Sequence, residues 1–83
     1  MKLLYFAWVR QKVGTSEEVV TPPASVTTVS ALVDFLRQRG PGFEAAFANL
    51  KTVRVAVNQR HSGLDAAVGP DDEVAFFPPV TGG

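Results

Sequence analysis

The last six residues of the sequence are the part best suited to chemistry, because they could present an unhindered carboxylate on a thin, uncharged arm. In order, they are Pro78, Pro79, Val80, Thr81, Gly82 and Gly83. The prolines favour an extended polyproline conformation, and six extended residues span roughly 20 Å. Glycine lacks a Cβ atom, so the end of the arm could enter a narrow channel. We interpret the Gly83 carboxylate as a reactive group; a frayed terminus without a role is the alternative.

The rest of the sequence offers little catalytic equipment. Its 83 residues include no cysteine, which excludes disulfides, thiolate metal sites and a cysteine nucleophile. The single histidine, His61, has no second histidine or cysteine beside it, so we expect a solvated loop residue. The acidic residues Asp65, Asp71, Asp72 and Glu73 lack the spacing of a calcium loop and favour an acidic turn. We therefore expect no metal site and no catalytic side chain.

Charge and composition narrow the class of protein. Eight basic and eight acidic residues give zero formal net charge, which argues against a nucleic-acid surface. The hydrophobic fraction of 46% and the charged fraction of 19% argue against disorder. The apolar run at residues 3–9 is too short to span a membrane and has no signal-peptide pattern. We expect one cytoplasmic domain, residues 1–77, followed by a tail, residues 78–83.

Four segments show the patterns of strands and turns. Residues 3–9 are apolar on both faces and predict a central strand. Residues 17–21 predict a second strand, which could pair with the first as an antiparallel hairpin. Valines alternate with other residues over 52–58 and predict a half-buried strand, while residues 58–63 resemble a turn or loop. Glu73–Phe77 is expected to form the last strand after a turn at residues 69–72.

One main helix is predicted between the second and third strands. Thr28 is its expected N-cap, and the stop signal is Gly40 followed by Pro41. The apolar stripe of the helix consists of Val29, Leu32, Val33 and Leu36. A second, shorter helix is expected to hold Phe43, Phe47 and Leu50 on one side. One principal helix crossing one sheet is an α+β design.

The sheet face that points away from the helix is expected to be apolar. Val74 and Phe76 should face the helix, which leaves Phe77 on the opposite side with the residues that alternate with the buried ones. The predicted outward set is Leu4, Phe6, Trp8, Ala56, Ala75 and Phe77. Such a patch favours a partner site; the alternative is a second small core covered by residues 58–68.

Three stretches of the sequence are similar to a known family. They are residues 2–15, the run Val55-Ala56-Val57-Asn58-Gln59, and the run from Asp72 through Phe77-Pro78-Pro79 to Gly83. With them, the chain resembles the small subunits of molybdopterin synthase, the MoaD-type sulfur carriers. The resemblance implies a ubiquitin-like β-grasp fold: a mixed sheet crossed by one main helix, with an extended C-terminal tail. Residues 23–51 resemble the family only in pattern.

The resemblance also implies a mechanism and partners. An adenylating enzyme (MoeB-type, related to ubiquitin activators) would use ATP to form an acyl-adenylate at Gly83. A sulfur donor enzyme would convert it to a thiocarboxylate, which the tail would carry into the large subunit (MoaE-type) of a heterotetrameric synthase. There the sulfur would pass to cyclic pyranopterin monophosphate in molybdenum cofactor biosynthesis. The chain itself would bind no cofactor and would act as the sulfur-donating subunit of a sulfurtransferase.

Three residues outside the tail take a role from the same resemblance. Phe6, Arg10 and Phe77 match positions that dock the partner proteins. His61 departs from the pattern, because some family members carry an apolar residue there.

Other functions remain open on the residues alone. A protein of the same fold could use Gly83 to form isopeptide bonds with lysines, as a ubiquitin-like modifier. A plain adaptor could bind through its sheet and carry an idle tail. A carrier for thiamine synthesis fits less well, because the Phe-Phe-Pro-Pro stretch matches the molybdopterin branch better.

Overall fold

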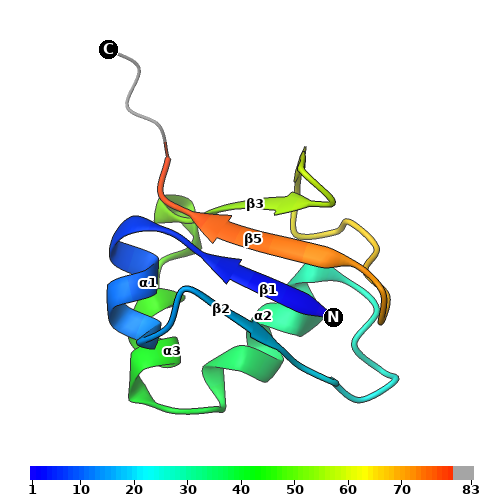
Figure 1. The fold of residues 1–83 in the computed structure, drawn as a ribbon, viewed down its shortest axis with the longest axis horizontal. Helices are drawn as coiled ribbons and strands as arrows, with labels where there is room; N and C mark the ends of the chain where they lie inside the picture. The colour runs from blue at the N-terminus through cyan, green and yellow to red at the C-terminus, as the bar shows by residue number, and fades with distance from the viewer. Residues whose placement is uncertain (80–83) are drawn as a thin grey trace.

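The computed structural model of the chain describes residues 1–79. Strands and helices follow each other in a fixed order along the chain (Figure 1). They are β1 (Lys2–Tyr5), α1 (Ala7–Val13), β2 (Glu17–Val19), α2 (Val29–Arg37), α3 (Pro41–Ala46), the 3₁₀ helix η1 (Leu50–Thr52), β3 (Arg54–Val57), β4 (Arg60–Ser62) and β5 (Glu73–Phe77). Val80, Thr81, Gly82 and Gly83, which carry most of the predicted reactive tail, lie outside the described residues.

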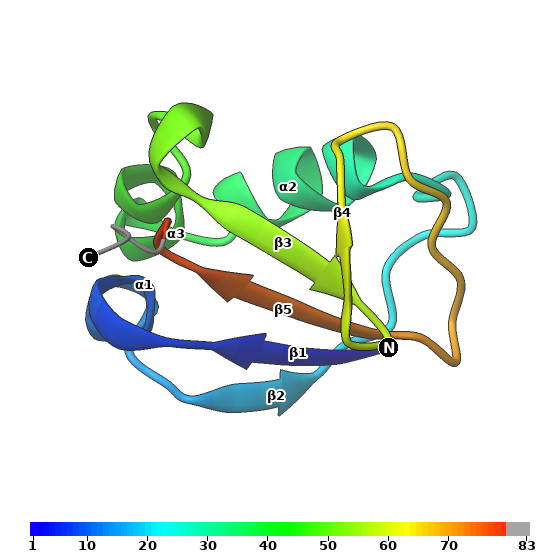
Figure 2. The same ribbon diagram turned by 90° about the horizontal axis from the view of Figure 1, so that it is seen from above.

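The strands form one mixed sheet in the order β2-β1-β5-β3-β4. The first and last strands pair in parallel, with Lys2 beside Glu73 and Tyr5 beside Phe76, and the other pairs are antiparallel. The helices α2 and α3 lie on one side of this sheet (Figure 2). The α+β class and the mixed sheet with one main helix are therefore confirmed. We call the sheet side away from α2 the outer face.

The first apolar run is only half a strand, so its prediction as a strand over residues 3–9 is wrong beyond Tyr5. Phe6 still bonds to β5 through its amide, which donates to the Phe76 carbonyl over 3.1 Å. The chain then turns through Ala7, whose φ is 52°, and continues as α1. Helix α1 buries Val9 completely and ends at Gly14, whose φ is 91°. A seven-residue apolar run contains too few periods to distinguish a strand from a buried helix.

The main helix confirms its prediction in detail. The Thr28 hydroxyl oxygen accepts a hydrogen bond from the Ala31 amide at 3.2 Å, which satisfies one of the free amides of the first turn. All four residues of the predicted stripe are buried. A shorter second helix is present as α3, but it ends at Ala46, so the prediction that one helix holds Phe43, Phe47 and Leu50 is only partly right. Phe43 lies in α3, Phe47 is its buried C-cap residue, and Leu50 begins η1.

Aromatic rings fill the space between the sheet and the helices. The Phe76 ring stacks on Tyr5 with centroids 6.0 Å apart, and it meets the Phe47 ring edge-on at 5.0 Å. Phe43 completes the group through an edge contact with Tyr5 at 6.3 Å. Offset and edge-to-face contacts of this kind add to the stabilisation from burial alone.

The segment after β3 begins with the predicted turn, but residues 60–62 form a strand, so the segment is a hairpin and not a loop. Asn58 and Gln59 have φ angles of 51° and 69°, the left-handed pair that suits a two-residue turn between antiparallel strands. The turn returns the chain as β4, which pairs with β3 and places His61 opposite Ala56. The Asn58 side chain is also held, because its amide donates to Asp72 over 2.9 Å.

Candidate functional site

The described part of the tail begins where the central strand ends. β5 runs from Glu73 to Phe77 and continues directly into Pro78 and Pro79. Proline has no amide hydrogen to donate to a neighbouring strand, so sheet pairing ends at this point. Because β1 and β5 are parallel, the chain leaves the sheet at the end opposite Met1, beside α1 (Figure 1).

The three residues assigned to partner docking lie together at this end of the sheet. Phe6 directly follows Tyr5, the partner of Phe76 in the parallel ladder, so Phe6 and Phe77 are neighbours across two strands. Arg10 lies one helical turn beyond Phe6, and its amide donates to the Phe6 carbonyl over 3.3 Å. Phe6 is 48% exposed, so a large aromatic residue is partly open to solvent beside the root of the tail.

The outer face beside these residues is an apolar strip. Strand register places Leu4, Ala75 and Ala56 in one row across β1, β5 and β3. Trp8 is not part of this face, contrary to prediction, because it lies in α1 and packs against the core. The predicted alternative, a second small core covered by residues 58–68, is not formed by the whole segment. His61 touches Phe77 on this face, whereas residues 64–68 bond through their backbone to residues 27–30 at the start of α2.

His61 lies at the β4 edge of the same face. Its side chain is exposed, as predicted, but it belongs to a strand and not to a loop. The imidazole meets the Phe77 ring edge-on, with ring centroids 5.3 Å apart. A polar ring therefore touches Phe77, the last aromatic residue before the tail. The sequence did not indicate this contact, because the segment that contains His61 was expected to be a loop.

Arg54 is a further residue at the site that the sequence analysis did not select. It pairs with Phe77 in the β3–β5 ladder, so its side chain emerges on the outer face and is exposed. Alternation along residues 52–58 was a usable signal, because it places Arg54 on the same side as Ala56.

A charged network lies at the β2 edge, away from the tail. The Tyr5 hydroxyl donates to Glu18 over 2.8 Å, and Arg39 donates to both oxygens of the same carboxylate over 2.9 Å. Burial raises the pKa of Tyr5, and the bond to Glu18 raises it further. Burial acts to raise the pKa of Glu18, but hydrogen bonds from Arg39 and Tyr5 outweigh it and leave that pKa lowered. This network stabilises the fold and does not reach the tail.

The acidic turn before β5 has a structural role as well. One Asp72 oxygen accepts from the Asn58 side chain and the other from the Gly69 amide at 2.7 Å. These two bonds lower the pKa of the Asp72 carboxyl. Within residues 1–79, no group of three or more histidine and acidic side chains is placed to hold a metal ion.

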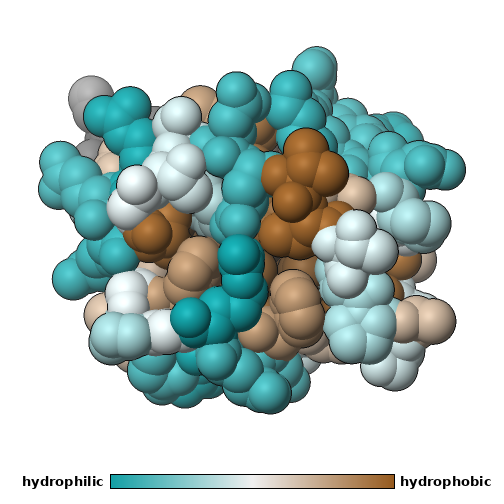
Figure 3. Space-filling view, turned by 60° about the horizontal axis from the view of Figure 1, so that its bottom comes forward, coloured by the Kyte–Doolittle hydropathy of each residue, from teal (hydrophilic) through white to brown (hydrophobic). Residues whose placement is uncertain are grey.

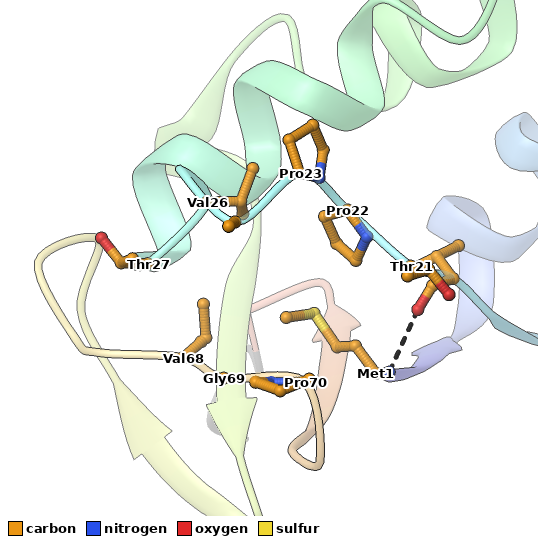
Figure 4. Close-up of a pocket in the computed structure, with 11 residues that line it drawn as sticks. Met1, Thr21, Pro22, Pro23, Val26, Thr27, Val68, Gly69 and Pro70 are labelled. Atoms are coloured by element: carbon orange, nitrogen blue, oxygen red, sulfur yellow. Dashed lines mark hydrogen bonds between the residues drawn. The ribbon is translucent and has the colours of Figure 1, made fainter.

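The surface has a cavity far from the tail. This cavity, of ≈ 390 Å³, lies at the Met1 end of the sheet between Pro22, Val68 and Pro70 (Figure 4). The Met1 amine there donates to the Val20 carbonyl over 3.0 Å.

On the face drawn in Figure 3, apolar side chains form two areas separated by a hydrophilic band. None of the helices in the described residues is long and apolar enough to cross a membrane.

Comparison with known proteins places this chain in a family. The profile of the ThiS family matches residues 3–83. A molybdopterin synthase sulfur carrier subunit from Escherichia coli is 41% identical over 83 residues, which is 100% of this chain and 99% of that protein. Its counterpart from Haemophilus influenzae is 36% identical with the same coverage.

A solved structure shares the fold. The crystal structure of H. volcanii small archaeal modifier protein 1 superposes with a TM-score of 0.79 at 26% identity, covering 96% of this chain and 97% of that one. Sequence and structure agree over nearly the whole length, from β1 to β5. The chain therefore belongs to the ThiS family.

Proposed function

We propose that this chain is the sulfur carrier subunit of a molybdopterin synthase, acting in molybdenum cofactor biosynthesis in the cytoplasm. One observation carries the proposal: the central strand continues into a Pro78-Pro79 tail beside an exposed aromatic surface, in a chain that matches relatives of that name over its full length. A carrier of this kind needs no catalytic side chain, because its reactive group is its terminal carboxylate.

The chemistry begins with activation of the Gly83 carboxylate. A carboxylate oxygen attacks the α-phosphorus of ATP on an adenylating enzyme, which releases pyrophosphate and leaves an acyl-adenylate. Sulfur at the oxidation level of sulfide, delivered by a donor enzyme, then attacks the acyl carbon, AMP leaves, and Gly83 ends in a thiocarboxylate. The thiocarboxylate sulfur is a better nucleophile than a carboxylate oxygen and attacks carbon of cyclic pyranopterin monophosphate, where the new C–S bond replaces a bond from that carbon to oxygen. Water then cleaves the bond between this sulfur and the Gly83 acyl carbon, which leaves the sulfur on the pterin and returns Gly83 to a carboxylate. ATP is a substrate of the activating enzyme and is not held by this chain.

The described residues suit a carrier that must dock before it delivers. Phe6 and Phe77 offer apolar area at the root of the tail, and Arg10 adds a cation beside them. In the proposed complex these residues hold the large subunit while Pro78, Pro79, Val80, Thr81 and Gly82 pass into its active site. The adenylating enzyme would read the same surface when it activates Gly83.

Deletion of Gly83 tests the proposal directly. Intact-mass analysis of the protein from sulfur-replete cells should show a fraction in which one oxygen at Gly83 is replaced by sulfur. The shortened chain should keep the melting temperature of the full chain, because the deleted residue follows the last strand, and should lose sulfur transfer to the large subunit. Transfer retained without Gly83 would exclude the proposed reaction.

A protein modifier is the second candidate, supported by the structural likeness to small archaeal modifier protein 1. It predicts conjugates in which Gly83 is joined to lysines of other proteins. Affinity purification followed by peptide sequencing would detect these conjugates. If they were more abundant than the thiocarboxylate form, protein modification would be the main function and sulfur transfer the minor one. An adaptor with an idle tail predicts instead that blocking the carboxylate changes nothing.

A further inference from the structure

We propose that Arg54 recognises a carboxylate on the large subunit, at the rim of the cleft that receives the tail. The inference rests on the proposed function, because it assigns a contact within the complex of carrier and large subunit. It adds a second cation to the docking surface, on the side of Phe77 opposite Arg10.

Strand register fixes the place of Arg54 relative to the tail. Arg54 pairs with Phe77, the last residue of β5, and neighbouring strands lie about 4.8 Å apart. Phe6, the residue that follows β1, lies on the other side of Phe77. Arg10 lies one helical turn beyond Phe6, in α1. Two arginines therefore bracket the point where the chain leaves the sheet.

Arg54 keeps most of its hydrogen-bonding capacity. One terminal nitrogen donates to the Lys51 carbonyl over 3.1 Å, whereas a guanidinium carries five N–H groups. Among residues 1–79, the ion pairs are Lys2–Glu17, Arg37–Glu44 and Arg39–Glu18, none of which uses Arg54. An exposed guanidinium with free donors, at the beginning of β3, suits bidentate binding of a carboxylate.

The acidic residues of the outer face lie outside the row that contains Phe77. Glu17 is opposite Leu4 on the β2 edge, and Glu73 is opposite Lys2 at the start of β5. The row that contains Phe77 has Arg54 on one side and Phe6 on the other, with no acid in it. This end of the face is therefore apolar with a basic border, which complements an apolar partner surface with an acidic rim.

The proposed Arg54 contact would help to orient the carrier on the large subunit. Between Val74 and Gly83 the sequence carries no charged side chain, so apart from the carboxylate at its tip the tail offers no charge that could orient its root. Cations on both sides of its root would steer the encounter and fix the rotation of the carrier about the tail.

The experiment compares binding of the full-length carrier and two variants to the purified large subunit of the same organism. Arg54→Gln should weaken binding about tenfold, as expected for a lost charge-assisted hydrogen bond. It should also slow association and flatten its dependence on salt. Arg60→Gln is the matched control, because Arg60 lies in β4 opposite Val57 and so belongs to the other side of the sheet; it should bind as the wild type does.

The outcomes separate this inference from the proposed function. If the wild type binds and Arg54→Gln behaves like Arg60→Gln, the role of Arg54 is overturned while the carrier function stands. A loss confined to adenylation, with unchanged binding to the large subunit, also overturns it, since it assigns Arg54 to the activating enzyme. Failure of the wild type to bind the large subunit overturns both. Matched thermal melts of the two variants show that a binding loss is not unfolding.

Discussion

Phe76 and Phe77 are neighbours in the sequence with opposite surroundings. Phe76 is 1% exposed and contacts two aromatic rings, whereas Phe77 lies on the outer face against His61. The alternation of a strand produces this division, and the sequence predicted it correctly. The neighbour of Phe77 could not be predicted in the same way, because His61 reaches it only through a hairpin that the polar composition of residues 58–63 concealed.

Alanine substitutions at the two positions should therefore have separate effects. Phe76→Ala should lower the free energy of unfolding by about 3–5 kcal/mol, because it leaves a cavity among the core rings. Phe77→Ala should keep nearly all of the stability and weaken binding to the large subunit at least about tenfold, as a central aromatic anchor does. Chemical denaturation and calorimetric binding give the two readouts. Equal loss of stability in both variants would contradict the assignment of Phe77 to the outer face.

Among the elements, α1 shows where sequence patterns stop being informative. Its residues are apolar enough for a strand, and only the position of Gly14 as a left-handed C-cap marks a helix end. By contrast, α2 was predictable because nine residues carry a full apolar stripe and a capping threonine. The contact between α1 and α3 was invisible in the sequence, since it depends on a backbone approach at Gly42.

Gly42 is needed where α3 meets α1. A Cβ atom on Gly42 would overlap with the Lys12 carbonyl oxygen, which is backbone and cannot rotate away. Gly42→Ala should thus destabilise the fold by about 1–3 kcal/mol through overpacking. Gly69→Ala is the control, because its Cβ would meet only an Asp72 side-chain oxygen at 3.8 Å. Thermal melts of both variants test the difference, and equal melting temperatures would rule out the tight contact.

At the scale of the whole molecule, the network of Tyr5, Glu18 and Arg39 ties the sheet to the helical layer. It joins β1 and β2 to the segment between α2 and α3, and the Arg39 guanidinium also lies over the Phe43 ring at 4.8 Å. The family match predicted the architecture but not this link, because its partners are far apart in the sequence and residues 23–51 follow the family only in pattern.

The network makes stability depend on acid pH. Because the pKa of Glu18 is lowered in the folded protein, its contribution is present above the unfolded pKa, about 4.3, and is lost as pH falls through the folded value. Glu18→Gln should remove about 1 kcal/mol at neutral pH and flatten the decline below pH 5. Urea unfolding at several pH values measures this. An unchanged slope in the variant would show that other carboxylates, such as Glu44 and Asp72, dominate.

The central place of β5 also makes folding a checkpoint for activation. β5 joins the β2-β1 pair to the β3-β4 pair and comes last among the described strands, so a nascent chain stopped before Glu73 lacks the strand that links the two pairs. The pairing of Lys2 with Glu73 is among the most distant contacts in the sequence and must await nearly complete synthesis. An activating enzyme that binds the outer face together with the tail would consequently adenylate complete, folded carriers and would not adenylate truncated or misfolded ones.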